Sequence, residues 1–237
     1  MCTVTIAPTF DNGFILTSNR DEAPDRIPLA PKFYETDACT LLYPKDKTAG
    51  GTWVGVSSKN RIICILNGAF SNHKKKDKYR VSRGIIAKDF MTCDHVVNTS
   101  ETYNLNDVEP FTMVIADWNS SLSFYELIWD GDNKHFQKLP LEPKIWSSST
   151  LYTEVMKKER LSWFKDFCSK NQILPETLLK FHKTAGKGNI SYDVVMDRGH
   201  VKTTSITQIE KRGNDVTMTY ENILEQDITT KTLILSK

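Results

Sequence analysis

Cys2 is the residue whose position gives it the clearest route to chemistry. The chain begins Met1-Cys2-Thr3, and removal of the initiator Met would leave the Cys2 thiol beside a free α-amino group. An α-amine with a pKa of about 7.7–8.0 can serve as the base for a thiol with a pKa of about 8.5. The position therefore predicts an N-terminal nucleophile. The alternative is that Cys2 does no chemistry, as is usual for a cysteine at the second position.

The segment 19–22, Asn-Arg-Asp-Glu, offers the polar partners that such a nucleophile needs. Apolar and β-branched residues flank an Asp-Asn-Gly turn at 11–13, which is a strong hairpin signal. A hairpin returns the end of its second strand close to the start of its first. Side chains alternate along a strand, so Asn19 and Asp21 should share one face and Arg20 the other. Asp21 would then orient the α-amine; the alternative is a solvated loop with paired charges.

Two further polar positions are candidates for the same centre. Asn67 ends the nearly continuous apolar segment 61–66, and its amide N–H could stabilise an oxyanion. A turn residue that tolerates unusual backbone angles is the simpler explanation of Asn67. The segment 147–149, Ser-Ser-Ser, offers hydroxyl donors, and the start of a helix is again the simpler explanation.

The remaining pattern places these residues in an α+β protein. Strands are predicted on either side of the opening turn and over 53–56, 61–66, 111–117, 122–129, 192–196, 202–209, 216–220 and 229–235. Helices are predicted over 82–90, 94–102 and 174–181. Residues 145–151 are expected to open a further long helix, with Ser149, Thr150 or Thr153 as its cap. Strands and helices come in runs instead of alternating, which favours α+β layers over a doubly wound parallel sheet. A single domain over residues 1–237 is expected.

Composition argues against several classes of function. A net charge of +2 gives no general reason to bind nucleic acid. The short basic segment 73–78 is best explained as a solvated loop, with a weak phosphate or anionic-lipid patch as the alternative. No apolar run approaches the roughly 18 residues of a transmembrane helix, and no signal peptide is expected. The five cysteines and five histidines are dispersed, which predicts neither a disulfide framework nor a metal site. No cofactor is predicted.

Five motifs occur in order along the chain. They are Met-Cys-Thr-Val at the start, Ser-Asn-Arg-Asp-Glu at 18–22, Gly-Gly-Thr-Trp-Val-Gly-Val-Ser at 50–57, Leu-Asn-Gly at 66–68 and Val-Lys-Thr-Thr-Ser at 201–205. The ordered set resembles the NRDE family, also called the Transport and Golgi organisation protein 2 family. The resemblance implies an N-terminal nucleophile hydrolase-like fold: a four-layer αββα sandwich of two stacked, mainly antiparallel sheets between helical layers.

The implied fold is similar to the bile-salt hydrolase and penicillin V acylase branch, and that similarity suggests roles for particular residues. Cys2 would be the nucleophile, Asp21 the carboxylate that orients the amine, and Asn67 the oxyanion-hole asparagine. Ser18 stands where that branch has its catalytic arginine, three residues before the aspartate. The substrate clamp is therefore altered, and bile-acid hydrolysis is not predicted. The candidates for substrate binding are Asn19, Arg20, Ser148, which falls near a second asparagine of that branch, and Lys202, which replaces an arginine and differs from it in hydrogen-bonding geometry.

Two functions from different classes fit these observations. The first is a cysteine N-terminal nucleophile hydrolase acting on amide or thioester bonds of small lipid-like acids. The second is a non-catalytic trafficking factor for haem or an acyl-CoA-like lipid, linked to Golgi organisation and secretion. Both predict a small-molecule partner, either an acyl amide, an acyl thioester or haem. The expected location is the cytoplasm, with association with the Golgi or mitochondria, and whether the protein is an enzyme stays open.

Overall fold

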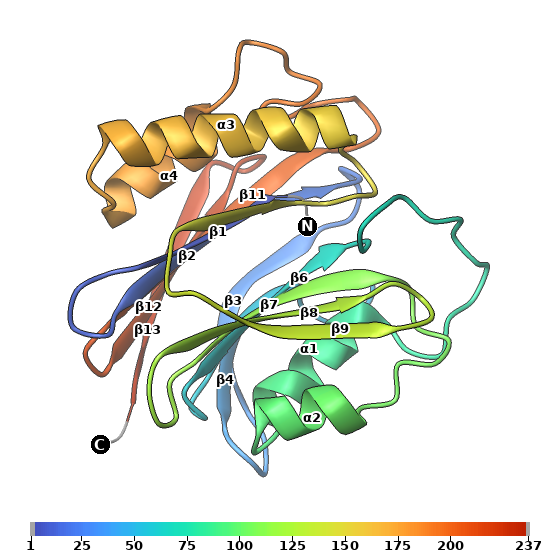
Figure 1. The fold of residues 1–237 in the computed structure, drawn as a ribbon, viewed down its shortest axis with the longest axis vertical. Helices are drawn as coiled ribbons and strands as arrows, with labels where there is room; N and C mark the ends of the chain where they lie inside the picture. Colours follow the sequence, from blue (N-terminus) through green and yellow to red (C-terminus); the bar gives the residue numbers. More distant parts are fainter. Residues whose placement is uncertain (1–2, 236–237) are drawn as a thin grey trace. The chain divides into compact units, whose positions relative to one another are not determined.

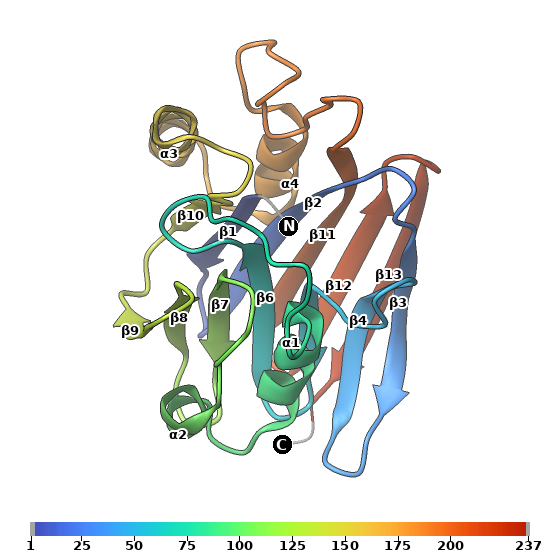
Figure 2. The same ribbon diagram turned by 90° about the vertical axis from the view of Figure 1, so that its right-hand side faces the viewer.

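The computed structural model describes residues 3–235 (Figure 1, Figure 2). The chain divides into two compact units, one formed by residues 1–26 and 142–237 and the other by residues 27–141. The first unit is therefore built from both ends of the sequence, with the second inserted between them as one continuous segment. Each unit contains one sheet and two helices, and the neighbouring strands of each sheet run antiparallel.

The sheet of the first unit has six strands. Their bounds are β1 Thr3–Pro8, β2 Phe14–Glu22, β10 Lys144–Ser147, β11 Lys202–Arg212, β12 Asp215–Asn222 and β13 Asp227–Ile234, and their order is β10-β1-β2-β11-β12-β13. The helices of this unit are α3, Glu154–Lys170, and α4, Pro175–Thr184. Helix α3 contacts β10, and α4 packs against β2 and β11, as Figure 2 shows. The strands that carry the expected site residues therefore lie next to one another.

The opening hairpin forms as the sequence predicts. Its two strands pair from Thr3 opposite Asn19 to Pro8 opposite Phe14. The turn holds Asp11 and Asn12 at positive φ, a conformation that Asp and Asn adopt more readily than most residues. The Asn-Gly signal therefore identified both the hairpin and the position of its turn.

The sheet of the second unit has seven strands. They are β3 Pro28–Glu35, β4 Thr40–Asp46, β5 Val54–Ser57, β6 Arg61–Asn67, β7 Phe111–Asp117, β8 Ser123–Trp129 and β9 Lys134–Leu139, and they are hydrogen-bonded in sequence order. Helix α1, Arg83–Thr92, packs against β5 and β6, and α2, Val96–Thr102, follows it. A Cβ atom built on Gly51 would lie 2.9 Å from backbone atoms of Gly84. The glycine pair thus lets the start of α1 approach the segment before β5 backbone to backbone.

Two predicted elements are wrong. Residues 145–151 do not open a helix; 144–147 form β10, because Trp146 pairs with Val4 of β1, and α3 begins later with Thr153 as its N-cap. Residues 192–196 do not form a strand but a series of turns and bends. Their carbonyls accept side-chain hydrogen bonds in place of a strand partner, as described below. Strands β3, β4 and β9 were not predicted.

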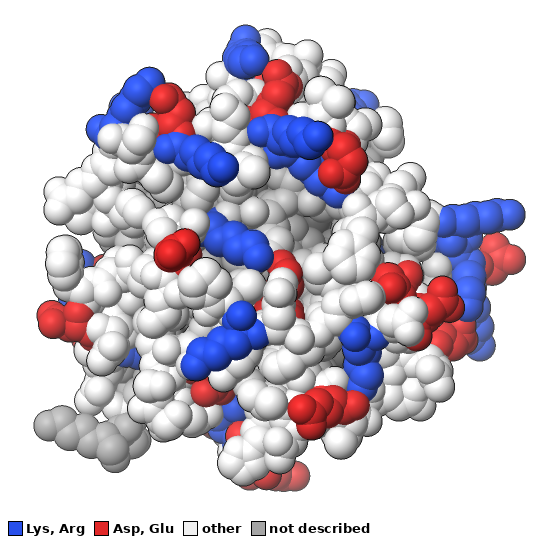
Figure 3. Space-filling model, in the orientation of Figure 1, with Lys and Arg blue, Asp and Glu red and all other residues white. Residues whose placement is uncertain are grey.

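Charged side chains of both signs are interspersed over the face shown in Figure 3, in agreement with the small net charge. In the part of the chain that the structure describes, no helix has both the length and the hydropathy needed to cross a membrane.

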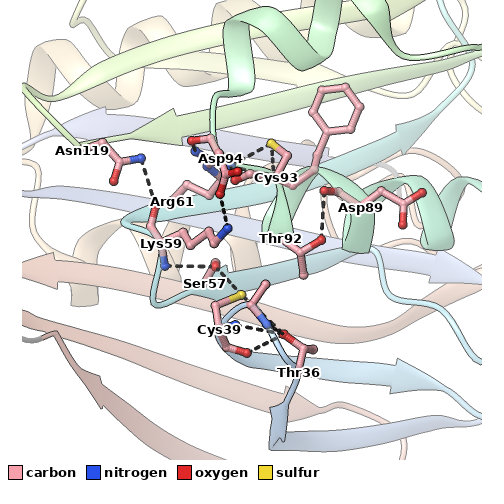
Figure 4. A network of polar contacts seen from close by, with 12 residues as sticks. Thr36, Cys39, Ser57, Lys59, Arg61, Asp89, Thr92, Cys93, Asp94 and Asn119 are labelled. Atoms are coloured by element: carbon pink, nitrogen blue, oxygen red, sulfur yellow. Dashed lines mark hydrogen bonds and ion pairs between the residues drawn. The ribbon is translucent and has the colours of Figure 1, made fainter.

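Arg61, at the start of β6, is a buried cation in the polar network of Figure 4. Its Nη2 lies 3.0 Å from Oδ2 of Asp117. Its guanidinium also donates to the backbone carbonyls of Phe90 at 3.1 Å, Cys93 at 2.5 Å and Asp94 at 3.2 Å. These carbonyls lie in and after the last turn of α1, where a helix leaves acceptors without intrahelical donors. Arg61 therefore ties α1 to the sheet while Asp117 neutralises its charge.

We expect Arg61→Met to lower the free energy of unfolding by about 3 kcal/mol or more, because it leaves the partly buried Asp117 and the α1 carbonyls without their cation. Urea unfolding followed by circular dichroism measures the loss. Arg212→Met is the matched control, since the Arg212 side chain is 81% exposed and paired with Glu210 on the surface. Equal losses in the two variants would contradict a structural role for the Arg61 network.

Candidate functional site

Asp21, the expected orienting carboxylate, is buried near the end of β2, with 2% of its surface exposed. Thr203 Oγ1 donates to its Oδ1 at 2.6 Å, and the Tyr152 hydroxyl donates to its Oδ2 at 2.7 Å. Thr203 Oγ1 also accepts from the Met196 amide at 2.9 Å. Because the Met196 amide donates to the Thr203 oxygen, the hydroxyl proton of Thr203 is free to point at Asp21. The carboxylate is thus held in one orientation by neutral donors on two different segments.

A β-bulge in β11 accounts for these contacts. Thr203 pairs with Asp21 and Ser205 with Arg20, so Thr204 is the extra residue of the bulge. Arg20 Nη1 donates to Thr204 Oγ1 and to the Arg26 carbonyl, both at 3.1 Å. Arg20 and Asp21 therefore have different sets of partners, as the alternation of side chains along a strand predicts.

Asn19 joins β2 to α4 through a fully buried hydrogen-bond chain. Its Nδ2 donates to the carbonyls of His182 at 3.0 Å and Val194 at 2.7 Å. Its Oδ1 lies 2.5 Å from His182 Nδ1, so Nδ1 is the donor. His182 Nε2 is then the acceptor for Thr5 Oγ1 at 2.8 Å. Asn19 uses both of its side-chain groups inside the protein, and contact with a substrate stays a prediction for this residue.

His182 is neutral at physiological pH. Burial, and after it the positive charge of Arg160, lower the pKa of His182 to about 3. In the neutral ring, Nδ1–H donates to Asn19 and Nε2 accepts from the Thr5 hydroxyl, so the hydrogen-bond chain accommodates this state.

Arg160, on α3, contacts both Thr3 at the start of β1 and Tyr152, which donates a hydrogen bond to Asp21. Its side chain is fully buried and Nη1 donates to Thr3 Oγ1. Its Nη2 donates to the carbonyls of Tyr192 at 2.8 Å and Asp193 at 2.7 Å. The guanidinium carbon lies 3.6 Å from the centroid of the Tyr152 ring, a cation–π distance. The Tyr192 and Asp193 carbonyls are among those that the expected strand over 192–196 would have used.

Sequence reasoning missed Arg160, Tyr152, Thr203 and His182. The available signal was weak: Arg160 precedes Phe164 by four residues and so shares its helix face. An arginine is ordinarily assigned to the exposed face, and its burial depends on partners far away in the sequence.

The other predicted residues lie as follows. Ser148 follows β10 and is buried, with Oγ 2.9 Å from Thr150 Oγ1. Lys202 opens β11 opposite Glu22. Asn67 ends β6 in the second unit. Cys2 lies outside the described residues. The first unit thus brings Asn19, Arg20 and Asp21 together beside the strand that carries Lys202, and the functional roles of all these residues stay predictions.

A surface groove of about 580 Å³ lies between α3, α4 and the segment after α4. Its lining includes three aromatic residues, one cation, one carboxylate and several uncharged polar residues; the aromatic residues are Trp163, Phe167 and Phe181, the cation is Lys180 and the carboxylate is Asp166. Its size falls within the range of small-molecule pockets, roughly 300–1,000 Å³. Within residues 3–235, no group of three or more His, Cys, Asp or Glu side chains could hold a metal ion.

Solved structures show which class of fold this is. A variant of the conjugated bile acid hydrolase from Clostridium perfringens matches with a TM-score of 0.55 at 11% identity, covering 100% of this chain and 98% of that one. A Caenorhabditis elegans ortholog of N-acylethanolamine-hydrolyzing acid amidase matches with a TM-score of 0.60 at 10% identity, covering 88% and 92%. Both have the N-terminal nucleophile hydrolase fold, which confirms the predicted fold class.

The sequence identifies the family. It matches the model of Transport and Golgi organisation 2 over residues 1–224, so the chain belongs to that family and the resemblance is confirmed. No curated protein matches the sequence. The family match extends over both units, and the single domain expected over 1–237 stays a prediction.

The buried neutral state of His182 makes stability depend on pH. The unfolded chain binds a proton at this position below about pH 6.5, whereas the folded protein does so only near pH 3. Stability should therefore fall by about 1.4 kcal/mol per pH unit as the pH drops through this window. We expect wild type to lose more stability than His182→Gln between pH 6.5 and 4.5 in urea titrations. Exposed His200→Gln is the control, and parallel curves for wild type and His182→Gln would contradict the assignment.

Proposed function

We propose that this protein is a cysteine hydrolase of the N-terminal nucleophile type, acting on amide or thioester bonds of small lipid-like acids. The observation that carries the proposal is the buried, doubly hydrogen-bonded carboxylate of Asp21. It lies two residues beyond Asn19, which pairs with Thr3, the residue bonded to Cys2. The family membership and the fold support the same assignment.

The chemistry follows from a thiol and an amine on one residue. Cys2 Sγ attacks the carbonyl carbon of the substrate, and its proton passes to the α-amine. Collapse of the tetrahedral intermediate breaks the C–N or C–S bond, and the leaving group takes that proton. Water, deprotonated by the amine, then hydrolyses the thioester and regenerates Cys2. Asp21 would orient the amine, and oxyanion stabilisation by Asn67 stays a prediction.

The substrate class is supported by the structural neighbours and limited by this sequence. The neighbours are named as a hydrolase of conjugated bile acids and an amidase of N-acylethanolamines, which supports an acyl substrate here. Ser18 donates to the Thr207 carbonyl at 3.5 Å, and a serine cannot supply the charge of an arginine clamp. We therefore propose an acyl substrate without proposing bile acids.

Intact mass spectrometry after brief iodoacetamide treatment tests the nucleophile. We expect protein from the native host to lack Met1 and to gain one carbamidomethyl group, located on Cys2 by peptide mapping. Cys2→Ala should lose this rapid labelling and lose hydrolysis of acyl amides and thioesters, with unchanged melting. Asp21→Asn should slow both reactions at least tenfold through a misoriented amine, whereas exposed Asp25→Asn should not. A chain that retains Met1 would overturn the proposal.

A second candidate function is a non-catalytic carrier of haem or an acyl-CoA-like lipid, linked to Golgi organisation and secretion. The groove between α3 and α4 favours it, because aromatic walls suit an apolar ligand and Lys180 suits an anionic group. The carboxylate of Asp166 in the same groove is paired with Lys170 at 2.6 Å. This function would not require the thiol of Cys2. Its cytoplasmic location with association with the Golgi or mitochondria stays a prediction.

If the carrier function holds, haem or an acyl-CoA should raise the melting temperature of wild type and Cys2→Ser equally, since both bind ligand in the folded state. Lys180→Glu should reduce the shift by placing like charge beside the anionic group. Lys165→Glu, at an exposed position on α3, is the matched control. A melting temperature unchanged by haem, acyl-CoA and fatty acids would exclude this function.

A further inference from the structure

Within residues 3–235, the side chains of Arg61 and Arg160 have no exposed surface, and they differ in how their charge is balanced. Arg61 has Asp117 at 3.0 Å. Arg160 donates to a hydroxyl and to backbone carbonyls, and it makes no ion pair with any carboxylate in residues 3–235. Burying a cation without a counter-ion is costly. A purely structural explanation therefore suffices for Arg61 and leaves the charge of Arg160 unexplained.

The acidic groups around Arg160 have other partners. Glu159, next to it on α3, pairs with Lys187 at 3.0 Å. Asp193 presents its carbonyl to Arg160, while its carboxylate accepts from the amides of Lys187 and Gly188. Asp21 accepts a hydrogen bond from the hydroxyl of Tyr152, whose ring lies between Asp21 and Arg160. Among the described residues, His182 of α4, Tyr192 after α4 and Arg198 also face this region, and the Arg198 guanidinium lies 5.5 Å from the centroid of the Tyr152 ring.

The charge of Arg160 acts on neighbouring groups through a poorly screened interior. It contributes to the lowered pKa of His182, although the two residues belong to different helices. It also donates to Thr3 Oγ1, and Thr3 is bonded to Cys2. A positive charge favours the deprotonated form of any titratable group near it.

We propose that Arg160 is a positioning residue of the Cys2 centre, which fixes the start of β1 through Thr3 and supplies a positive charge that favours the Cys2 thiolate and the neutral α-amine. This inference rests on the hydrolase proposed above. Arg160 does not itself contact the reacting atoms. It acts by holding Thr3 and, through the ring of Tyr152, the residue that orients Asp21.

The test is the pH dependence of Cys2 alkylation by iodoacetamide, measured between pH 5.5 and 9.5 by peptide mapping. Removal of the charge in Arg160→Gln should move the midpoint of the rate profile upward by about one pH unit, because Arg160 is a buried cation that contacts the residue bonded to Cys2. Arg198→Gln is the matched control, because Arg198 is more exposed and lies farther from the Tyr152 ring. Its midpoint should stay near that of wild type.

Two milder variants separate position from charge. Arg160→Lys keeps the charge but cannot reach Thr3, Tyr192 and Asp193 together, so its midpoint should stay near wild type while the alkylation rate falls severalfold. Thr3→Val removes the hydroxyl and should do the same. These two variants carry the test if Arg160→Gln does not fold. A loss of packing alone would not shift the midpoint.

The outcomes distinguish this inference from the function on which it rests. If wild-type Cys2 is not alkylated, or Met1 is retained, the hydrolase itself is wrong. If wild-type Cys2 reacts with a clear midpoint, and folded Arg160→Gln has the same midpoint, the role of Arg160 is overturned while the hydrolase stands. An unchanged rate in Arg160→Lys and Thr3→Val would likewise overturn the positioning role.

Discussion

The antiparallel pairing of β2 with β11 is the constraint on which the candidate site depends. It sets Thr203 opposite Asp21, and the bulge at Thr204 keeps both side chains in hydrogen-bonding reach. Because side chains alternate with a period of two, a register shift of one residue would exchange the environments of Arg20 and Asp21. The carboxylate would then lose the hydroxyl groups of Thr203 and Tyr152 as donors. The chemistry proposed for Cys2 therefore depends on a strand from the opposite end of the sequence.

The interior between α3, α4 and the sheet of the first unit combines an apolar cluster with buried polar side chains. Arg160, His182 and Asn19 are all fully buried, and each is satisfied by hydrogen bonds. Such a network is stable only when its members are all partnered. This requirement explains why the segment after α4 is irregular: its carbonyls serve as acceptors for these side chains. The segment after α4 therefore forms no strand, and its carbonyls bind Arg160 and Asn19 instead. Arg160 in turn contacts the ring of Tyr152, which donates to Asp21.

Residue types and local spacing predicted much of the fold. The Asn-Gly turn predicted the hairpin, and apolar runs predicted β6 and β7. The family resemblance added the fold class, and the motif order identified Asp21 as a candidate. Features that depend on contacts between distant segments could not be predicted. Strand β10 forms because Trp146 pairs with Val4, and Arg160 is buried because Thr3 and Tyr192 supply acceptors. The roles of Tyr152 and Thr203 beside Asp21, and of His182 beside Asn19, were not predicted. No local sequence pattern marks these contacts, because each joins residues more than 100 positions apart.

The insertion of residues 27–141 between the two parts of the first unit has a consequence for biosynthesis. About 180 residues separate the end of β2 from the start of β11, a synthesis time of roughly 10–40 s at typical translation rates. The second unit can fold while the opening hairpin still lacks its neighbouring strand. An aminopeptidase acting on the nascent chain therefore meets the N-terminus before β11 has been made. The removal of Met1 that is proposed above can therefore precede completion of the sheet.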